Sequence, residues 1–212
     1  IVGGIVAVWN ELPQAEEEEG NTAMIPLEQM LLMVLAAITV ESVFFSRGMG
    51  FYEILQGAGR GRNISAYSLF LTVFSIGSGF LSRWIAEVTE LDQKLWLLLL
   101  AAGSVLLCYL VVCLVLVILF PSMYRKVGWC IGPAAINTTV FSMPFLAEQQ
   151  QWGNWQMLGF AIGTGLAFWL LSWIMAEQLP RLRHISMPAA FQGMPAALLF
   201  LGILALGFLG FG

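Results

Sequence analysis

Two groups of polar residues interrupt long apolar stretches of this sequence, and their oxygen atoms are suited to binding a cation or relaying a proton. A carboxylate inside a membrane-spanning segment costs about 2.5–3.5 kcal/mol on insertion scales, so it usually faces a partner or a cavity. In an alternative interpretation, Glu41 only reaches the membrane surface and pairs with Arg47. The candidate lining residues of an ion pathway are Glu41, Ser42, Asn137, Thr138 and Thr139.

Helix breakers accompany both groups. Gly48 and Gly50 follow the first, and Gly132 and Pro133 precede the second. A broken helix at membrane depth leaves backbone N–H and C=O groups unpaired, which is tolerated only inside protein or beside a water-filled cavity. We therefore expect two broken helices whose polar side chains satisfy part of the freed backbone. The alternative, that Pro133 only kinks a packed helix, stays open.

The composition predicts that these segments lie in a membrane. Hydrophobic residues make up 59% of the 212 residues and charged residues 10%, against about 45–50% apolar residues in a soluble domain. A spanning helix needs about 20 mostly apolar residues. Six stretches meet this requirement, at about 24–46, 66–86, 95–120, 127–147, 153–176 and 189–211. We expect an all-α, polytopic membrane protein with six transmembrane helices.

Other chemistries lack support in the sequence. Cys108, Cys113 and Cys130 show no CxxC spacing and no neighbouring histidine cluster, so we expect no metal site. We interpret Cys108 and Cys113, which lie inside the third apolar stretch, as packing residues. The single histidine, His184, lies in a basic loop. No basic patch suggests nucleic acid, and no hydrolase triad, phosphate loop or zinc motif is present.

Positive charges alternate between the connections of the six stretches. Basic residues lie in the first, third and fifth connections: Arg60, Arg62, Arg125, Lys126, Arg181 and Arg183. Because Lys and Arg are enriched in cytoplasmic loops, these connections are predicted to be cytoplasmic, and both ends of the six-helix unit to face outward.

The six stretches divide into two sets of three, and an odd number per set inserts the second set in the opposite orientation. The segments ESVFFS (41–46) and TTVFSM (138–143) occupy matching places in the two sets. Interrupted apolar segments at corresponding positions of two halves point to a site at the interface of inverted repeats. We expect repeats of about 24–120 and 121–212, each with a broken first helix.

Glycines recur in the fifth and sixth stretches and allow helices to approach closely. We expect such contacts at Gly159, Gly163, Gly165, Gly202, Gly207 and Gly210.

Several motifs resemble a known family. YRKVG, GPAAIN and the C-terminal PAAFQGMPAALLFLGILALGFLGFG are similar to the six-helix membrane subunits of the Rnf and Na⁺-translocating NADH:quinone oxidoreductase (Nqr) complexes, of the RnfA/NqrE type. The resemblance begins near residue 28, so residues 1–23 form a tail outside it and residues 24–212 the family-like membrane domain. It implies an inverted repeat of three helices, each repeat starting with a helix broken near the midplane.

The same resemblance implies an iron–sulfur cofactor, but this sequence lacks the cysteines that would bind it. In the family each broken helix supplies one cysteine, and two such subunits together hold a [2Fe–2S] cluster. The matching positions here are Tyr52 and Thr138, and Cys130 lies eight residues before Thr138. Because such clusters are held chiefly by thiolates, we expect no cluster in this chain.

The leading functional hypothesis is therefore an integral membrane subunit of an Rnf/Nqr-like ion-translocating electron-transport complex. It would line a Na⁺ or H⁺ pathway at the repeat interface and would not be catalytic alone. Expected partners are other membrane subunits, including an inverted sister subunit, in the lipid bilayer of a bacterial or archaeal cytoplasmic membrane. Two alternatives stay open: a stand-alone transporter of an ion or small solute that has lost the redox role, and a purely structural subunit.

Overall fold

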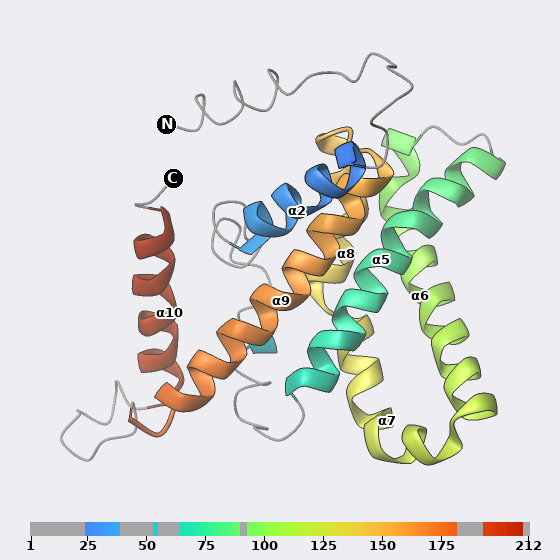
Figure 1. The fold of residues 1–212 in the computed structure, drawn as a ribbon. Coiled ribbons are helices and arrows are strands. Elements are labelled where there is room, and N and C mark those ends of the chain that lie inside the picture. The colour runs from blue at the N-terminus through green and yellow to red at the C-terminus, as the bar shows by residue number, and fades with distance from the viewer. Residues whose placement is uncertain (1–23, 39–52, 55–63, 90–92, 182–192, 210–212) are drawn as a thin grey trace.

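The computed structural model describes residues 24–38, 53–54, 64–89, 93–181 and 193–209, and the named elements within these ranges are helices (Figure 1). Their bounds are α2 (Met24–Ile38), α5 (Ile64–Thr89), α6 (Gln93–Leu119), α7 (Pro121–Ala135), α8 (Thr138–Gln149), α9 (Asn154–Gln178) and α10 (Met194–Leu209). The predicted all-α class is thus confirmed. Five of the predicted site residues lie outside the described residues: Glu41, Ser42, Gly48, Gly50 and Tyr52.

The long helices coincide with the predicted spans. Apolar helices of 25, 24 and 25 residues occupy 64–88, 96–119 and 154–178. Helices α7 and α8 together are also long and apolar enough for a span, and they are bent by 48° at a short break, as in a broken span or a re-entrant loop. The shorter apolar helices α2 and α10 fall in the first and last predicted stretches. The described residues therefore contain three helices long enough to cross a membrane, or four with the bent pair.

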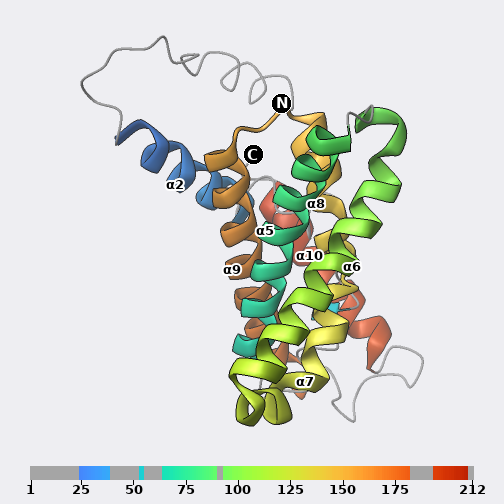
Figure 2. The same cartoon turned by 90° about the vertical axis from the view of Figure 1, so that its right-hand side faces the viewer.

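Helix α6 lies on the outside of the bundle (Figure 2), and only 11% of its apolar window is buried. The chain turns directly from α6 into α7 at Pro121, which occupies the first turn of α7. Proline is favoured there because its missing N–H would have no partner at a helix start. This tight corner places α7 and α8 against α5.

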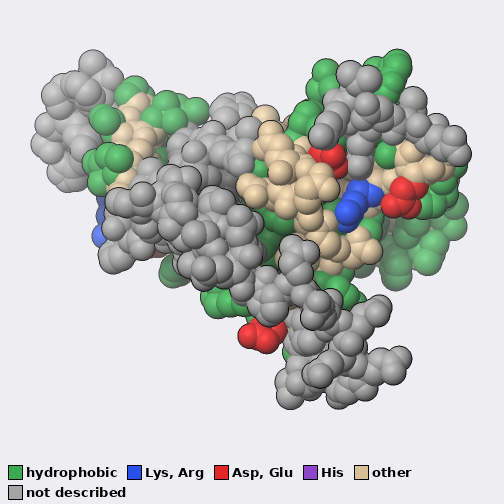
Figure 3. Space-filling model, turned by 90° about the horizontal axis from the view of Figure 1, so that it is seen from above, with side chains coloured by type: hydrophobic (Ala, Val, Ile, Leu, Met, Phe, Trp, Pro, Cys, Tyr) green, Lys and Arg blue, Asp and Glu red, His purple; other side chains and the backbone are tan. Residues whose placement is uncertain are grey.

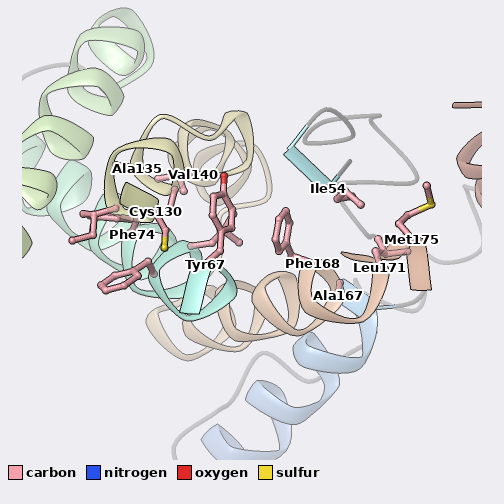
Figure 4. Packing of buried hydrophobic residues seen from close by; sticks show 14 of the residues in the cluster. Ile54, Tyr67, Phe74, Cys130, Ala135, Val140, Ala167, Phe168, Leu171 and Met175 are labelled. Atoms are coloured by element: carbon pink, nitrogen blue, oxygen red, sulfur yellow. The ribbon is translucent and has the colours of Figure 1, made fainter. Parts of the chain in front are cut away.

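Two clusters of buried side chains form the core. The main cluster joins α5, α7, α9 and α10 and includes Tyr67, Phe74, Phe168 and Leu171, all at most 5% exposed (Figure 4). The rings of Tyr67 and Phe168 are stacked with their centroids 5.0 Å apart. A smaller cluster, which includes Met33, joins α2 to α8 and α9.

Small residues allow α2 and α5 to lie directly on α9. A Cβ atom added at Gly163 would come within 2.7 Å of the Val34 carbonyl oxygen and of Ala37 Cβ, and one at Gly165 would collide with Thr72 Oγ1. These contacts confirm the close approach expected in the fifth stretch. At Gly202 and Gly207 an added Cβ would meet nothing within 4 Å among the described residues, so close approach there stays a prediction for packing with another subunit, and Gly210 lies outside the described residues.

The described charged side chains lie near helix ends. Arg83, near the end of α5, donates from Nη1 to Asn154 Oδ1 at the start of α9, at 3.1 Å. At the other end of α9, Arg181 and Glu177 form an exposed ion pair at 3.4 Å. Figure 3, looking along the bundle, shows a small group of acidic and basic side chains with hydrophobic side chains around it. This distribution matches helices with apolar middles and polar ends.

Candidate functional site

The break between α7 and α8 is the centre of the candidate site. Helix α7 ends at Ala135, and Asn137 begins the next helix in an extended conformation with its Oδ1 accepting from the Thr139 N–H at 2.9 Å. Asparagine is among the preferred residues at this capping position because its side chain satisfies a backbone donor that the helix cannot. Gly132 and Pro133 lie in the last turn of α7, so the chain leaves the helix after them, at Ile136.

Tyr67 of α5 ties the end of α7 to the start of α8. In a continuous helix the Pro133 carbonyl would accept from the N–H of residue 137. Here it accepts from the Tyr67 hydroxyl at 3.0 Å, and Asn137 Nδ2 donates to the same hydroxyl across a longer 3.4 Å. Since an unpaired carbonyl in the membrane costs several kcal/mol, Tyr67 stabilises the broken form of this span.

The structure separates the two threonines that follow Asn137. Asn137 and Thr139 are fully buried, whereas Thr138 is exposed. The Thr139 carbonyl accepts from Ser142 Oγ at 2.7 Å, but Thr139 Oγ1 has no hydrogen-bond partner within the described part of the chain. Of the three predicted lining residues near this break, two therefore face the interior and one faces outward.

The sequence analysis missed a row of hydroxyl groups on α5. This row, here called the hydroxyl side of α5, consists of Ser68, Thr72, Ser75, Ser78 and Ser82. The spacings of four, three, three and four residues keep them on one helix face. The first and last of these residues are 14 positions apart, or about 21 Å at 1.5 Å per residue. That repeat was the signal in the sequence that could have revealed it.

Two hydroxyls of this row bind neighbouring helices. Ser68 Oγ donates to the Gly165 carbonyl of α9 at 3.0 Å. Ser78 Oγ donates to the Val140 carbonyl of α8 at 3.1 Å. The hydroxyl side of α5 therefore faces both α8 and α9, and it meets the first turn of α8 beside the break.

The cluster implied by the family resemblance does not fit the donor atoms at the described position. Thr138 offers a neutral hydroxyl at the surface, where the family places a thiolate. Cys130 is fully buried in the main core, and Cys108 packs on Gly77. Searching the described residues finds no group of three His, Cys, Asp or Glu side chains that could hold a metal ion. No step of the proposed mechanism is therefore assigned to a cluster in this chain.

Comparisons with known proteins extend these observations. No family model matches the chain. The chain is 27% identical, over 87% of its length and 97% of the relative's, to the A component of the ion-translocating oxidoreductase complex of Syntrophotalea carbinolica. It is 24% identical, over 86% of the chain and 96% of the relative, to the A component of the Na⁺-translocating ferredoxin:NAD⁺ oxidoreductase complex of Acetobacterium woodii. Over 43% of the chain and 47% of the relative, it is 33% identical to the A component of the proton-translocating ferredoxin:NAD⁺ oxidoreductase complex of Clostridium ljungdahlii.

The helices and the broken span define the class of this protein as a polytopic, all-α membrane protein. Within that class, the chain is a divergent relative of the RnfA-type components of ion-translocating oxidoreductase complexes, which confirms the resemblance noted in the sequence motifs.

Proposed function

We propose that this chain is an integral membrane subunit of an ion-translocating electron-transport complex and lines part of a Na⁺ or H⁺ pathway. The observation that carries the proposal is the similarity to the A component of such a complex over 87% of this chain and 97% of the relative. The broken span supports it, because irregular backbone at membrane depth is found where it lines a cavity or a site. The relatives' names include both ions, so they do not choose between Na⁺ and H⁺.

The lining of the pathway is assigned to the polar groups at the two breaks. Asn137 and Thr139 supply interior oxygen and nitrogen atoms at the fourth span. Glu41 and Ser42 are the proposed counterparts in the first repeat. Rearrangement of the broken helices would alternate access between the two sides, driven by redox chemistry in partner subunits. The chain would not be catalytic by itself.

The proposed surroundings follow from the same relationship and from the charge pattern. The chain would assemble with other membrane subunits, among them a sister subunit of opposite insertion, in a bacterial or archaeal cytoplasmic membrane. Both ends of the six-helix unit would lie outside. Exposed leucine and valine side chains along α6 suit contact with lipid or with another apolar helix.

Native purification in mild detergent, followed by mass spectrometry of all bound components, tests this function. Recovery with flavin-bearing or iron–sulfur-bearing subunits is the expected result. Recovery of the chain alone, or as a homo-oligomer, would reject the complex and favour the stand-alone transporter, which the missing cysteines suggest as the second candidate. Flux measurements in liposomes would then follow.

The iron content of the purified chain is a separate prediction. Because Thr138 and Tyr52 replace the family's thiolates, the purified chain is expected to contain no stoichiometric iron. Elemental analysis of the wild type and of Cys130→Ser measures this directly. Stoichiometric iron that survives the Cys130→Ser change would show that the cluster positions have been assigned wrongly.

A substitution at Glu41 distinguishes a role in the ion pathway from a purely structural role. Glu41→Gln keeps the size of the side chain but removes the charge, so ion-dependent activity is expected to be lost while assembly is retained. Activity of the purified complex in liposomes, together with its elution profile, measures both. Unchanged transport would remove Glu41 from the mechanism and favour its pairing with Arg47. A structural subunit would tolerate Glu41→Gln without loss of activity or assembly.

A further inference from the structure

Two buried hydroxyl groups beside the break lack partners. Ser75 Oγ on α5 and Thr139 Oγ1 on α8 belong to residues with 0% exposure, and neither finds a hydrogen-bond partner among the described residues. Serine and threonine in helices commonly donate to a carbonyl of their own helix, as Ser82 does to the Gly79 carbonyl at 2.9 Å. A native structure with an unsatisfied buried group calls for an explanation such as a bound water or ion.

Two hydrogen bonds made by α5, one to Asn137 and one to Val140, indicate where the two hydroxyls lie. Tyr67 bonds to Asn137, and Ser78 bonds to the carbonyl of Val140. Ser75 lies between Tyr67 and Ser78 on α5, and Thr139 lies between Asn137 and Val140. Ser75 lies about one helical turn before Ser78, and Thr139 directly precedes Val140, so both residues lie beside the Ser78–Val140 hydrogen bond between α5 and α8. Ser75 also lies near the middle of α5, at the depth where water outside the protein is absent.

Electrostatics favours a neutral occupant for this place. The stretches 64–82, 127–147 and 154–176, which supply the surrounding helices, contain no charged residue. Thr139 lies in the first turn of α8, where the helix dipole presents its positive end and opposes a cation. A water molecule can instead donate to and accept from hydroxyl groups.

We propose that the hydroxyls of Ser75 and Thr139 hold an internal water between α5 and the first turn of α8, and that this water is the midplane link of a proton path along the hydroxyl side of α5. The second part rests on the proposed function, because it names the proton as the ion that this chain conducts. In each transfer a hydroxyl, or the water, accepts a proton on a lone pair and releases a different proton to the next group. The excess proton enters from water at one end of the row and leaves to water at the other, so every group is neutral again after the proton has passed.

Removing the two hydroxyls tests the water site in the purified full-length chain. Ser75→Ala and Thr139→Val each keep the shape of the side chain and remove only its hydrogen-bonding group. If both bind one water, each change lowers the melting temperature by a few degrees, and the double change costs less than the sum. Ser104→Ala on α6 is the matched control, because this fully buried hydroxyl lies outside the row and donates to the Ala101 carbonyl of its own helix at 2.9 Å, and a smaller decrease is expected.

Melting temperatures that stay the same or rise in the variants would overturn the proposal. Removal of a dry, unpaired hydroxyl relieves a buried polar group, so unchanged or raised melting temperatures for both single variants mean that no water is held. Additive effects mean that the two hydroxyls do not share one. If Thr139→Val fails to fold, Thr139→Ser, which keeps the hydroxyl, must restore folding. Failure of the serine variant as well assigns the defect to packing and rejects the shared site.

The identity of the ion is tested separately. Proton uptake by proteoliposomes containing the purified native assembly should persist without Na⁺ and fall at least tenfold in the double variant, but not in Ser104→Ala. Stabilisation of the wild type by NaCl over choline chloride, lost in the double variant, would instead show a sodium site and overturn the water assignment. Absence of redox partners in the purification would reject the proposed function without affecting the melting results.

Discussion

Asn137 makes two contacts that depend on different atoms of one side chain. Its Oδ1 accepts from the Thr139 N–H and caps α8, and its Nδ2 donates to the Tyr67 hydroxyl of α5. The residue therefore both starts the second half of the broken span and attaches it to a neighbouring helix. Because the side chain is fully buried, bulk water cannot replace either contact.

Asn137→Ala is accordingly expected to destabilise the protein by about 1–3 kcal/mol, from the lost cap and the buried groups left without partners. Thermal unfolding of the detergent-solubilised chain measures the change. Asn137→Ser is the matched control, because serine also caps helices but cannot reach Tyr67 in the same way, and an intermediate loss is expected. Equal stability of the alanine variant and the wild type would mean that this cap is unimportant.

At the level of single residues, the sequence predicted the group around Asn137 but not its geometry. Amide and hydroxyl groups beside helix breakers indicated an interior site. The two threonines could not be assigned to opposite sides, since that depends on where α8 begins, and hence on which residue caps it. Tyr67 and Ser75 were missed because neither carries a charge and both lie in an otherwise ordinary apolar helix.

At the level of elements, the contact between α2 and α9 depends on glycine. Gly163→Ala would place a Cβ 2.7 Å from the Val34 carbonyl oxygen and from Ala37 Cβ, where neither backbone nor a short side chain can move away easily. Overpacking of this kind costs about 1–3 kcal/mol. We expect a lower melting temperature for this variant.

Gly103→Ala on α6 is the control for this substitution. Among the described residues, a Cβ at Gly103 would meet nothing within 4 Å, and alanine is favoured over glycine in a helix by about 1 kcal/mol. The control should therefore leave stability unchanged or raise it slightly. Equal losses in the two variants would indicate a general effect of side chains on the helices and not a specific α2–α9 contact.

The elements themselves were the most predictable feature, because hydropathy over about 20 residues directly reflects the thickness of the bilayer. The exact end of α7 was harder to predict from the sequence. Gly132 and Pro133 marked the region, yet α7 continues to Ala135 before Asn137 caps α8. A proline removes the hydrogen bond to the carbonyl four residues before it, whereas the carbonyl that Tyr67 binds is Pro133's own, which lacks a helical partner because α7 ends before residue 137. A contact between residues so far apart in the chain is not visible in a local pattern.

At the scale of the whole molecule, the uneven burial of the helices indicates which surface meets the surroundings. Most of α9 is inside, with 61% of its apolar window buried, against 11% for α6. The outward residues of α6 are large and aliphatic, for example Leu106, Leu110 and Leu114, each at least 55% exposed. Lipid tails can cover such a face without any specific packing, and so can another protein of the complex.

Leucine-to-alanine substitutions distinguish lipid from a neighbouring subunit as the partner of the exposed face of α6. Leu71 is fully buried in the main core, so Leu71→Ala is expected to cost about 2–5 kcal/mol in any state of assembly. Leu110 is 55% exposed, and Leu110→Ala in the isolated chain should change stability by less than about 0.5 kcal/mol. If lipid covers α6, Leu110→Ala will also leave the recovery of partner subunits unchanged in native purification. Loss of partners from this variant, with the stability of the isolated chain intact, would place a neighbouring subunit on α6.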